Sequence, residues 1–215
     1  QTTAQCSGPC PAGRRCSGAT VVPQICSAGT YCGVGSASET PCPTGTFSEV
    51  AGLADVSLCA PCDKGHWCFG GAKVACPVGT YNADTSGGSP ISCRSCPEAS
   101  ATAAPAATSV GECVCEKLYF DRRLGSNQST GPACVECPLG ANCTDAGTTA
   151  RTLHLQPGYW RPHENSGNLY RCPDASASPS ACGGGVGDPC RDSLRGPYCR
   201  VCVDPSHFFD ESASE

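Results

Sequence analysis

The sequence predicts a small disulfide-rich fold, drawn out as an extended rod of tandem cysteine-rich modules, mostly loops with short antiparallel hairpins. Cysteine accounts for 22 of 215 residues, a density typical of disulfide scaffolds in secreted chains. Leu, Ile, Val and Phe together number only 29, too few for a hydrophobic core of this length. Gly (26) and Pro (19) are frequent, and no segment has sustained helical spacing of apolar residues, so turns should outweigh helices.

Disulfides therefore have to supply the stability that burial does not. Closing a loop of about 15 residues is worth roughly 3 kcal/mol, mainly because it restricts the unfolded chain. Disorder is disfavoured, since only 15% of the residues are charged. The mild net charge of −5 argues against nucleic-acid binding. No apolar run is long enough to span a membrane, and the start at Gln1 suggests a processed terminus or an excised fragment.

An internal repeat runs through the middle of the chain. Cys42-Pro-Thr-Gly-Thr-Phe47 recurs as Cys76-Pro-Val-Gly-Thr-Tyr81, 34 residues further on. The cysteines that follow recur at the same offset: Cys59 and Cys62 in the first copy, Cys93 and Cys96 in the second. Three coincident offsets indicate a repeated structural module.

A shorter unit is Cys-x5-Cys with a Gly three residues after the first Cys. It occurs at Cys10–Cys16, Cys26–Cys32, Cys62–Cys68 and Cys137–Cys143. Glycine at that place fits a tight turn that needs a positive φ. The aromatic residues that follow Gly-Thr are expected to cover a neighbouring disulfide in place of a core, or else to lie exposed in loops. These residues are Tyr31, Phe47 and Tyr81.

The order of the cysteines resembles a known family. Cys76-Pro-Val-Gly-Thr-Tyr, Cys93-Arg-Ser-Cys96, Cys113-Val-Cys115 and Cys134 follow one another as in the cysteine-rich repeat of ephrin receptors. Similar repeats, related in style to tumour-necrosis-factor receptor modules, occur in tandem in large algal and protist surface proteins, mastigoneme-like filament subunits among them. The C-terminal third resembles a second segment of those protist proteins over Cys137–Cys143, Leu155–Arg161, Tyr170–Pro173, Ala181–Gly184 and Gly196–Cys202.

The resemblance implies the disulfides Cys76–Cys93, Cys96–Cys113 and Cys115–Cys134, and the internal repeat then implies Cys42–Cys59. The short units Cys62–Cys68 and Cys137–Cys143 are expected to close on themselves. The chain accordingly divides into four parts. These are short Cys-x5-Cys modules over 1–41, a cysteine-rich repeat over 42–75, an ephrin-receptor-like repeat with a Cys-x-Cys extension over 76–136, and a C-terminal cysteine-rich module over 137–215.

These six disulfides leave an odd number of cysteines at each end. They are Cys6, Cys10, Cys16, Cys26 and Cys32 before Cys42, and Cys172, Cys182, Cys190, Cys199 and Cys202 after Cys143. A bond between the two ends, a free thiol or an intermolecular bond at each end, or truncation of a longer chain would each explain the odd counts. Our hypothesis is a head-to-tail bond between protomers, with Cys6 and Cys202 as first choices, because a rod keeps its ends apart.

No motif for catalysis or for a cofactor is present. Four Cys-x-x-Cys pairs have the spacing of zinc ligands or of a redox motif: Cys59/Cys62, Cys93/Cys96, Cys134/Cys137 and Cys199/Cys202. They recur between disulfide loops, however, and we interpret them as hinges between modules. The four histidines form neither a metalloprotease motif nor a His-x3-His pair, and the acidic residues are not spaced as in a calcium loop. We expect no enzyme, no metal and no cofactor.

Two sequons predict N-linked glycans, Asn127-Gln-Ser129 and Asn142-Cys-Thr144. Residues 99–109 and 174–181 are rich in Ser, Thr, Ala and Pro and are either O-glycosylated segments or plain loops. The segment Tyr159-Trp160-Arg161 belongs to the most apolar, aromatic stretch of the chain. Those three residues either contact a partner or form the small core of the C-terminal module.

Two classes of function remain. The first is a structural subunit of an extracellular glycosylated assembly, such as a surface filament, flagellar hair or cell coat, with copies of itself or other matrix and surface proteins as partners. The second is a ligand-binding or adhesive ectodomain cut from a larger membrane protein. Both place the chain outside the cell or on its surface.

Overall fold

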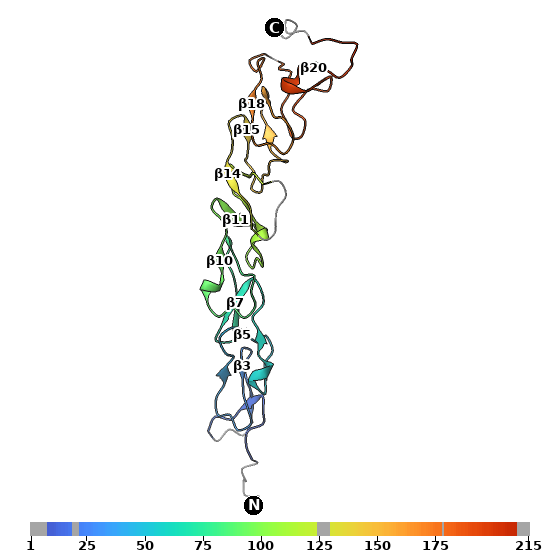
Figure 1. The fold of residues 1–215 in the computed structure, drawn as a ribbon. Helices are drawn as coiled ribbons and strands as arrows, with labels where there is room; N and C mark the ends of the chain where they lie inside the picture. The colour runs from blue at the N-terminus through green and yellow to red at the C-terminus, as the bar shows by residue number, and fades with distance from the viewer. Residues whose placement is uncertain (1–7, 19–21, 124–129, 178, 210–215) are drawn as a thin grey trace, which may run out of the picture. The chain divides into compact units, whose positions relative to one another are not determined.

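The computed structural model describes residues 8–18, 22–123, 130–177 and 179–209, and it has the predicted small disulfide-rich fold (Figure 1). Within these residues, twenty short strands pair into ten antiparallel hairpins. The helical segments there are four 3-10 turns: η1 (Val56–Leu58), η2 (Pro90–Ser92), η3 (Val110–Glu112) and η4 (Pro197–Cys199). None of the helical segments in the described ranges is long and apolar enough to cross a membrane.

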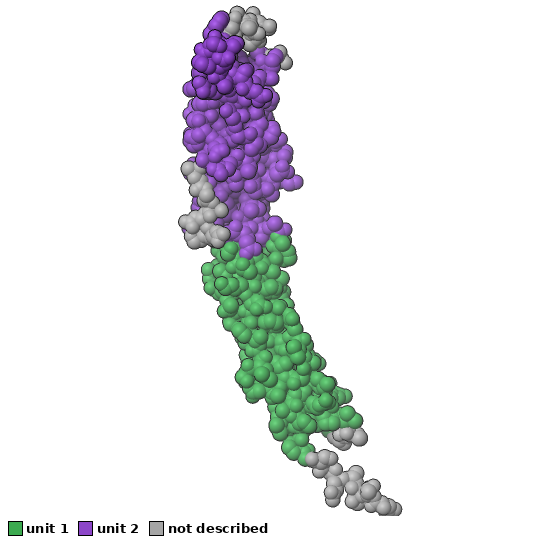
Figure 2. Space-filling view, turned by 90° about the vertical axis from the view of Figure 1, so that its right-hand side faces the viewer, with its two compact units in different colours: residues 1–95, 104–110 green, residues 96–103, 111–215 purple. Residues whose placement is uncertain are grey.

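Internal contacts divide the chain into two compact units (Figure 2). Unit 1 comprises residues 1–95 and 104–110, and unit 2 comprises residues 96–103 and 111–215. The hairpins of unit 1 are β1 (Arg14–Arg15) with β2 (Gln24–Ile25), β3 (Thr30–Tyr31) with β4 (Thr40–Pro41), β5 (Thr46–Phe47) with β6 (Ala60–Pro61), β7 (His66–Phe69) with β8 (Ala72–Ala75), and β9 (Thr80–Tyr81) with β10 (Arg94–Ser95). The four sequence-based module boundaries stay a prediction.

The hairpins of unit 2 follow the same pattern. They are β11 (Ser100–Thr102) with β12 (Cys113–Cys115), β13 (Tyr119–Asp121) with β14 (Cys134–Glu136), β15 (Ala141–Asn142) with β16 (His154–Leu155), β17 (Tyr159–Trp160) with β18 (Tyr170–Arg171), and β19 (Leu194–Arg195) with β20 (Val201–Cys202).

The Cys-Pro-x-Gly-Thr motif builds the turn that opens a hairpin. In the copy at Cys42, the N–H and the hydroxyl of Thr46 both donate to the carbonyl of Pro43, at 2.9 and 2.7 Å. Gly45 adopts a φ of +83°, which costs glycine little and other residues more. The carbonyl of Gly45 then accepts the N–H of Cys62, the first residue of the next hairpin, at 2.8 Å. The motif therefore fixes both the turn and its link to the following hairpin.

A second left-handed residue lies in the loops of the five hairpins from β3–β4 to β11–β12, and we call it the tip residue. In unit 1 the tip residues are Gly35, Gly52, Gly71, Ser86 and Ala106. The N–H of Ser86 donates to the carbonyl of Cys62, which begins the preceding hairpin, at 2.8 Å. Gly35, Gly52 and Ala106 donate in the same way to Cys10, Cys26 and Cys76. These bonds stack each hairpin on the one before it.

The tip residue also contacts the opening turn of the hairpin two places earlier. A Cβ added at Gly45 would lie 2.6 Å from the carbonyl oxygen of Ser86, and one added at Gly29 would lie 3.0 Å from that of Gly71. Gly13 and Gly65 face the carbonyls of Gly52 and Ala106 in the same way. Backbone therefore packs directly on backbone, with no room for a side chain between.

The described residues contain ten disulfides, among them all six pairs expected from the sequence. They are Cys10–Cys16, Cys26–Cys32, Cys42–Cys59, Cys62–Cys68, Cys76–Cys93, Cys96–Cys113, Cys115–Cys134, Cys137–Cys143, Cys172–Cys182 and Cys190–Cys199. The first eight follow one rule. The first cysteine of a hairpin bonds either to the residue six places on or to one 17 to 19 places on.

Where the longer bond is used, a polar residue takes the place six residues on. Asn82, Thr102 and Asp121 occupy this place and are buried, with exposures of 1%, 3% and 8%. The side-chain amide of Asn82 donates to the carbonyl of His66 at 2.8 Å, and its oxygen accepts the N–H of Asp84 at 3.1 Å. These hydrogen bonds satisfy the buried group and tie adjacent hairpins together.

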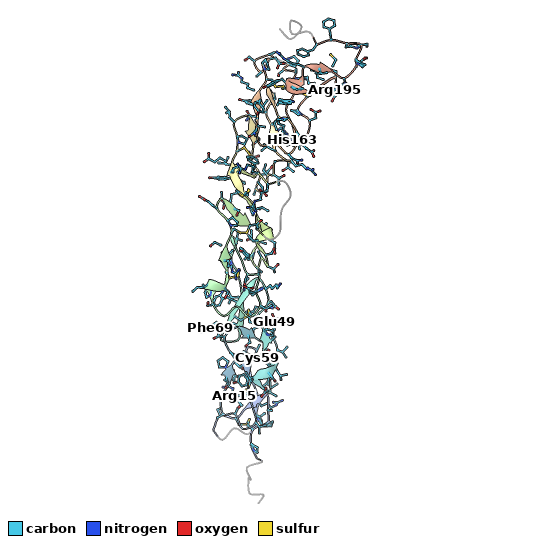
Figure 3. The ribbon with its side chains drawn as sticks, in the orientation of Figure 1. Arg15, Glu49, Cys59, Phe69, His163 and Arg195 are labelled. Carbon is cyan, nitrogen blue, oxygen red and sulfur yellow. A yellow bond between two sulfur atoms is a disulfide. The ribbon has the colours of Figure 1, made fainter. Side chains whose placement is uncertain are left out.

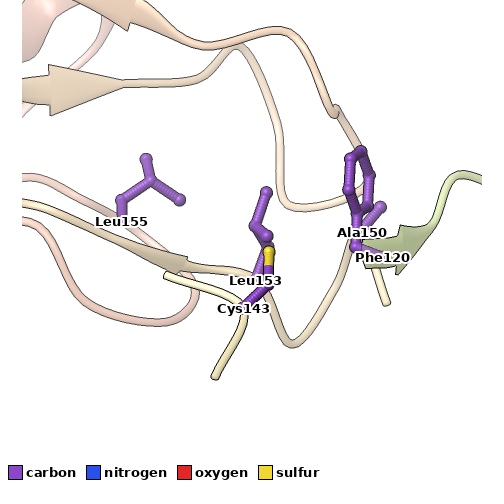
Figure 4. Packing of buried hydrophobic residues seen from close by; sticks show 5 residues of the cluster. All are labelled: Phe120, Cys143, Ala150, Leu153 and Leu155. Atoms are coloured by element: carbon purple, nitrogen blue, oxygen red, sulfur yellow. The ribbon is translucent and has the colours of Figure 1, made fainter. Parts of the chain in front are cut away.

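Small apolar clusters accompany the disulfides. In unit 1, Tyr31 packs against Cys42, Leu53 and Cys59, and Phe47 packs against Cys62 and Cys68, so each ring covers the disulfide of the following hairpin. In unit 2 a larger cluster contains Phe120, Cys143, Ala150, Leu153 and Leu155 (Figure 4). Leu153 and Leu155 are completely buried, which makes this cluster the nearest approach to a conventional core.

The backbone contact at the turn glycine generates a prediction with a matched control. Gly45 and Gly70 both have left-handed backbone, with φ values of +83° and +58°, but no described atom lies within 4 Å of a Cβ added at Gly70, in the turn between β7 and β8. Gly70→Ala should lower the free energy of unfolding by about 1–2 kcal/mol, the cost of a left-handed alanine. Gly45→Ala should cost about 1–3 kcal/mol more, because the Cβ displaces backbone. Guanidinium denaturation with the disulfides intact measures both, and equal losses would contradict the contact.

Candidate functional site

The aromatic segment identified in the sequence lies in the second half of unit 2. Tyr159 and Trp160 form β17, which pairs with β18 so that Trp160 lies opposite Tyr170. The Trp160 ring is half-buried, with its centroid 6.1 Å from that of Tyr170 and 5.2 Å from that of Tyr198. It also packs against the cluster of Cys172, Ala181, Cys182 and Cys199. Trp160 thus combines a contact with the core and a partly accessible ring.

Arg161 follows directly and is buried, with only 2% of its surface exposed. Its Nη1 donates to the carbonyl of Ala150 at 2.5 Å, and its Nη2 donates to that of Gly187 at 3.3 Å. The buried Nε has no hydrogen-bond partner. Burial lowers the pKa of the guanidinium, and the negative charge of Glu164 partly offsets this effect. An arginine stays protonated near neutral pH, so a positive charge lies beneath the surface here.

A hollow of about 450 Å³ opens beside this arginine. Trp160 and Arg161 line it together with the loop residues His163 and Glu164 and with Asp188. Pro162, Gly187, Pro189, Gly196 and Pro197 complete the wall. The Glu164 carboxylate pairs with Arg151 at 3.0 Å, and that of Asp188 accepts the N–H of Cys190 at 3.0 Å. The hollow therefore gathers an aromatic ring, two carboxylates, an imidazole and a guanidinium.

The wall formed by Gly196 and Pro197 continues into strained backbone. Tyr198 and Cys199 have φ values of +56° and +59°, in the left-handed region that non-glycine residues seldom adopt. The Cys190–Cys199 disulfide and the contact between the rings of Tyr198 and Trp160 lie at this point. Sequence reasoning missed Glu164 and Asp188, because they lie 3 and 27 residues beyond Arg161 in loops without a motif, and it singled out the segment from Gly196 to Cys202 without placing it beside Arg161.

The predicted modification and cross-linking sites lie in different places. Asn142 is exposed on β15, and its side-chain oxygen accepts the N–H of Thr144 at 3.2 Å. Cys143, the middle residue of that sequon, is in the disulfide with Cys137. Cys202 on β20 is the free cysteine of the described residues and is partly exposed. Cys6 and Asn127 lie outside the described residues.

Of the eight cysteines considered for metal or redox chemistry, all but Cys202 are in disulfides. In the first three Cys-x-x-Cys pairs every sulfur is in a disulfide with a cysteine outside the pair. Within the described ranges, one group has the proximity of a metal site, Cys172, Asp174 and Cys182. Its two sulfurs are bonded to each other, and Asp174 accepts the N–H of Ala181 at 2.6 Å. This group therefore offers no thiolate to a metal ion.

Comparison with known proteins gives one partial similarity. No family model matches the chain. A segment is 37% identical over 81 residues to the sushi, von Willebrand factor type A, EGF and pentraxin domain-containing protein 1 of Mus musculus, and 35% identical over 81 residues to that of Rattus norvegicus. The match covers 36% of this chain but only 2% of each of those proteins. With ten disulfides, the described residues form a disulfide-rich module of the type found in extracellular proteins.

The buried arginine yields a stability prediction. Arg161→Leu removes the donors for the carbonyls of Ala150 and Gly187 and should lower the free energy of unfolding by about 2 kcal/mol. Arg195→Leu, at an exposed place on β19, serves as the control and should change it by less than about 0.5 kcal/mol. Chemical denaturation of the oxidised proteins compares them. An Arg161→Leu variant as stable as the parent chain would show that the guanidinium does not hold the two loops.

Proposed function

We propose that the chain is a non-enzymatic structural subunit of an extracellular, glycosylated assembly, such as a surface filament, flagellar hair or cell coat. Its hairpins correspond in this proposal to ephrin-receptor-like repeats, as the order of the cysteines suggests. The observation that carries the proposal is the way one hairpin is joined to the next. From Cys10 to Cys143 each hairpin is closed by a disulfide, and backbone hydrogen bonds join neighbouring hairpins, so repeating the unit extends the structure and needs no large core.

The surface supports a role in assembly. Large apolar side chains stand exposed in both units, among them Ile91 (89%), Leu139 (84%), Phe208 (83%), Val34 (71%) and Phe69 (65%). Monomeric proteins tolerate single exposed apolar residues, but a large number in a chain this poor in apolar residues favours burial against neighbours. Copies of the same chain, or other matrix and surface proteins, would provide those neighbours.

The cysteines that are not used in hairpin disulfides offer a covalent link between protomers of the assembly. Cys202 carries no disulfide, and the four other C-terminal cysteines are bonded among themselves. Of the five N-terminal cysteines, four are likewise paired with one another, which leaves Cys6. A bond from Cys6 of one protomer to Cys202 of the next would use both remaining thiols and join the protomers head to tail.

The second candidate is a ligand-binding or adhesive ectodomain of a larger membrane protein. The hollow beside Arg161 favours it, because concave sites with a few convergent polar groups are typical of ligand binding. The partial similarity to a multidomain extracellular protein is also consistent with it.

Intact mass of the native material tests the covalent assembly. Without reductant, a head-to-tail polymer should give a series of multiples of the chain mass, and reduction should collapse the series to one chain. The Cys202→Ser variant should abolish the series, since Cys6 then lacks its partner. A dimer that persists in this variant would instead indicate a Cys6–Cys6 bond.

A single monomer mass with a reactive thiol at Cys202 would contradict the intermolecular bond. Electron microscopy of the same material would then separate the two candidates, because regular filaments without disulfide links support the structural subunit, and dispersed single chains support the ectodomain.

Glycosylation at Asn142 is a separate prediction. The residue is exposed, so the native protein should lose mass on removal of N-linked glycans, and Asn142→Gln should lack that glycan. Thr144→Ser keeps the sequon and should retain the glycan. Glycopeptide mass spectrometry compares the variants, and an unmodified Asn142 in native material would refute the prediction.

A further inference from the structure

The hollow beside Arg161 has features that neither the stacked hairpins nor the cross-links require. Its volume of about 450 Å³ falls in the range of small-molecule sites. Its floor contains a buried guanidinium whose Nε has no partner, and a buried donor left without a partner is costly. A structural role alone would be served by the two bonds from Nη1 and Nη2. The Nε–H of Arg161, a donor without a partner, indicates that this part of unit 2 has a role besides packing.

One wall of the hollow is aromatic and held rigidly. Trp160 lines the hollow and is only half-buried, and its ring contacts those of Tyr198 and Tyr170 at centroid distances of 5.2 and 6.1 Å. The left-handed backbone at Tyr198 and Cys199 follows directly on the wall residue Pro197. A fixed indole face is electron-rich and attracts polarised C–H groups.

A second hollow adjoins the first through His163, which lines both. It measures about 530 Å³ and is lined on one side by the loop of Asn165, Ser166, Gly167 and Asn168. Figure 3 labels His163 in this part of unit 2. Arg122 and Glu136 line its other side. Phe120, Val135 and Pro138 add an apolar part to its lining, so the second hollow, like the first, combines polar groups with an apolar face.

The charges of the first hollow exclude an anionic ligand as the best occupant. Arg161 supplies one positive charge, and the carboxylates of Glu164 and Asp188 supply two negative ones. Glu164 is already paired with Arg151. The set offers acceptors and donors in similar number beside an aromatic face, which suits a ligand with many hydroxyl groups and an apolar ring face.

The geometry points to a binding site for a neutral glycan, with one pyranose ring stacked on Trp160 and its hydroxyls bonded to Glu164, Asp188 and His163. Further sugar residues extend past His163 along the Asn165–Asn168 loop. This site does not depend on the proposed assembly, because it lies within unit 2 of a single chain.

Saturation-transfer NMR on the full oxidised chain tests the site. The probes are methyl β-glucoside, methyl α-mannoside, cellobiose and lactose at millimolar concentration, with glucuronic acid and glucose 6-sulfate as anionic counterparts. At least one neutral sugar should receive saturation, the disaccharide more strongly than its monosaccharide. Tryptophan fluorescence of the Trp67→Phe variant, which keeps Trp160 as its one indole, should shift on addition of the same sugar.

Variants locate the binding. Trp160→Ala should weaken the affinity about tenfold, the value of a lost aromatic stacking contact. Because Trp160 also packs in the core, Glu164→Gln and His163→Ala provide exposed alternatives, and each should weaken binding without changing the near-ultraviolet circular dichroism. Trp67→Ala in unit 1 is the matched control and should leave the affinity unchanged.

Several results would overturn the assignment. They are the absence of saturation transfer to every neutral sugar, preferential binding of the anionic sugars, or an affinity that Trp160→Ala, Glu164→Gln and His163→Ala all leave unchanged. None of these results bears on the mass series, so this inference and the proposed assembly can fail separately.

Discussion

The contact between a tip residue and the turn glycine two hairpins earlier is the constraint on which the stacking in unit 1 depends. At Gly45 and Ser86 the backbones approach so closely that a Cβ would lie 2.6 Å from a carbonyl oxygen. The same tip residue donates its N–H to the intervening hairpin, at Cys62. Three successive hairpins are thereby joined at one point without any large side chain. A chain with 29 large aliphatic or phenylalanine residues in 215 can be ordered in this way because backbone supplies the contacts.

The place six residues after the first cysteine decides how each hairpin is held. When it is Cys, a short disulfide forms, as at Cys62 and Cys68. When it is Asn82 or Asp121, the first cysteine bonds 17 or 19 residues further on, and the polar side chain is buried and hydrogen-bonded. The carboxylate of Asp121 accepts two backbone N–H groups at 3.0 Å, those of Arg123 and Ala133. Covalent and hydrogen-bonded closure are thus alternatives at a single position of the repeat.

Sequence patterns predict the hairpins that contain cysteine well, because the positions of cysteine and of the turn glycine are easily recognised in a sequence. The repeat of 34 residues comprises two hairpins, which in its first copy are 42–61 and 62–75. The second hairpin is shorter than the first, and its disulfide joins cysteines closer in the sequence. Ala99 and Leu118 stand where the other turns have glycine, with φ values of +55° and +70°. No propensity rule assigns a left-handed turn to alanine or leucine. Disulfides on both sides of these turns hold them in place, a tertiary effect that a local pattern cannot reveal.

The candidate site lies at the hairpin that departs most from the cysteine pattern of the other hairpins. In the hairpin of β17 and β18, Leu155 takes the place of the first cysteine and Arg161 the place six residues on. Without the disulfide, the leucine joins the apolar cluster of Phe120 and Leu153, and the guanidinium bridges the carbonyls of Ala150 and Gly187. A guanidinium spans a wider gap than a disulfide and carries more donors than two carbonyls use. The loops it joins therefore stand apart and leave a hollow, so the hairpin that exchanges its cysteine pair for leucine and arginine gains room for a ligand beside the guanidinium.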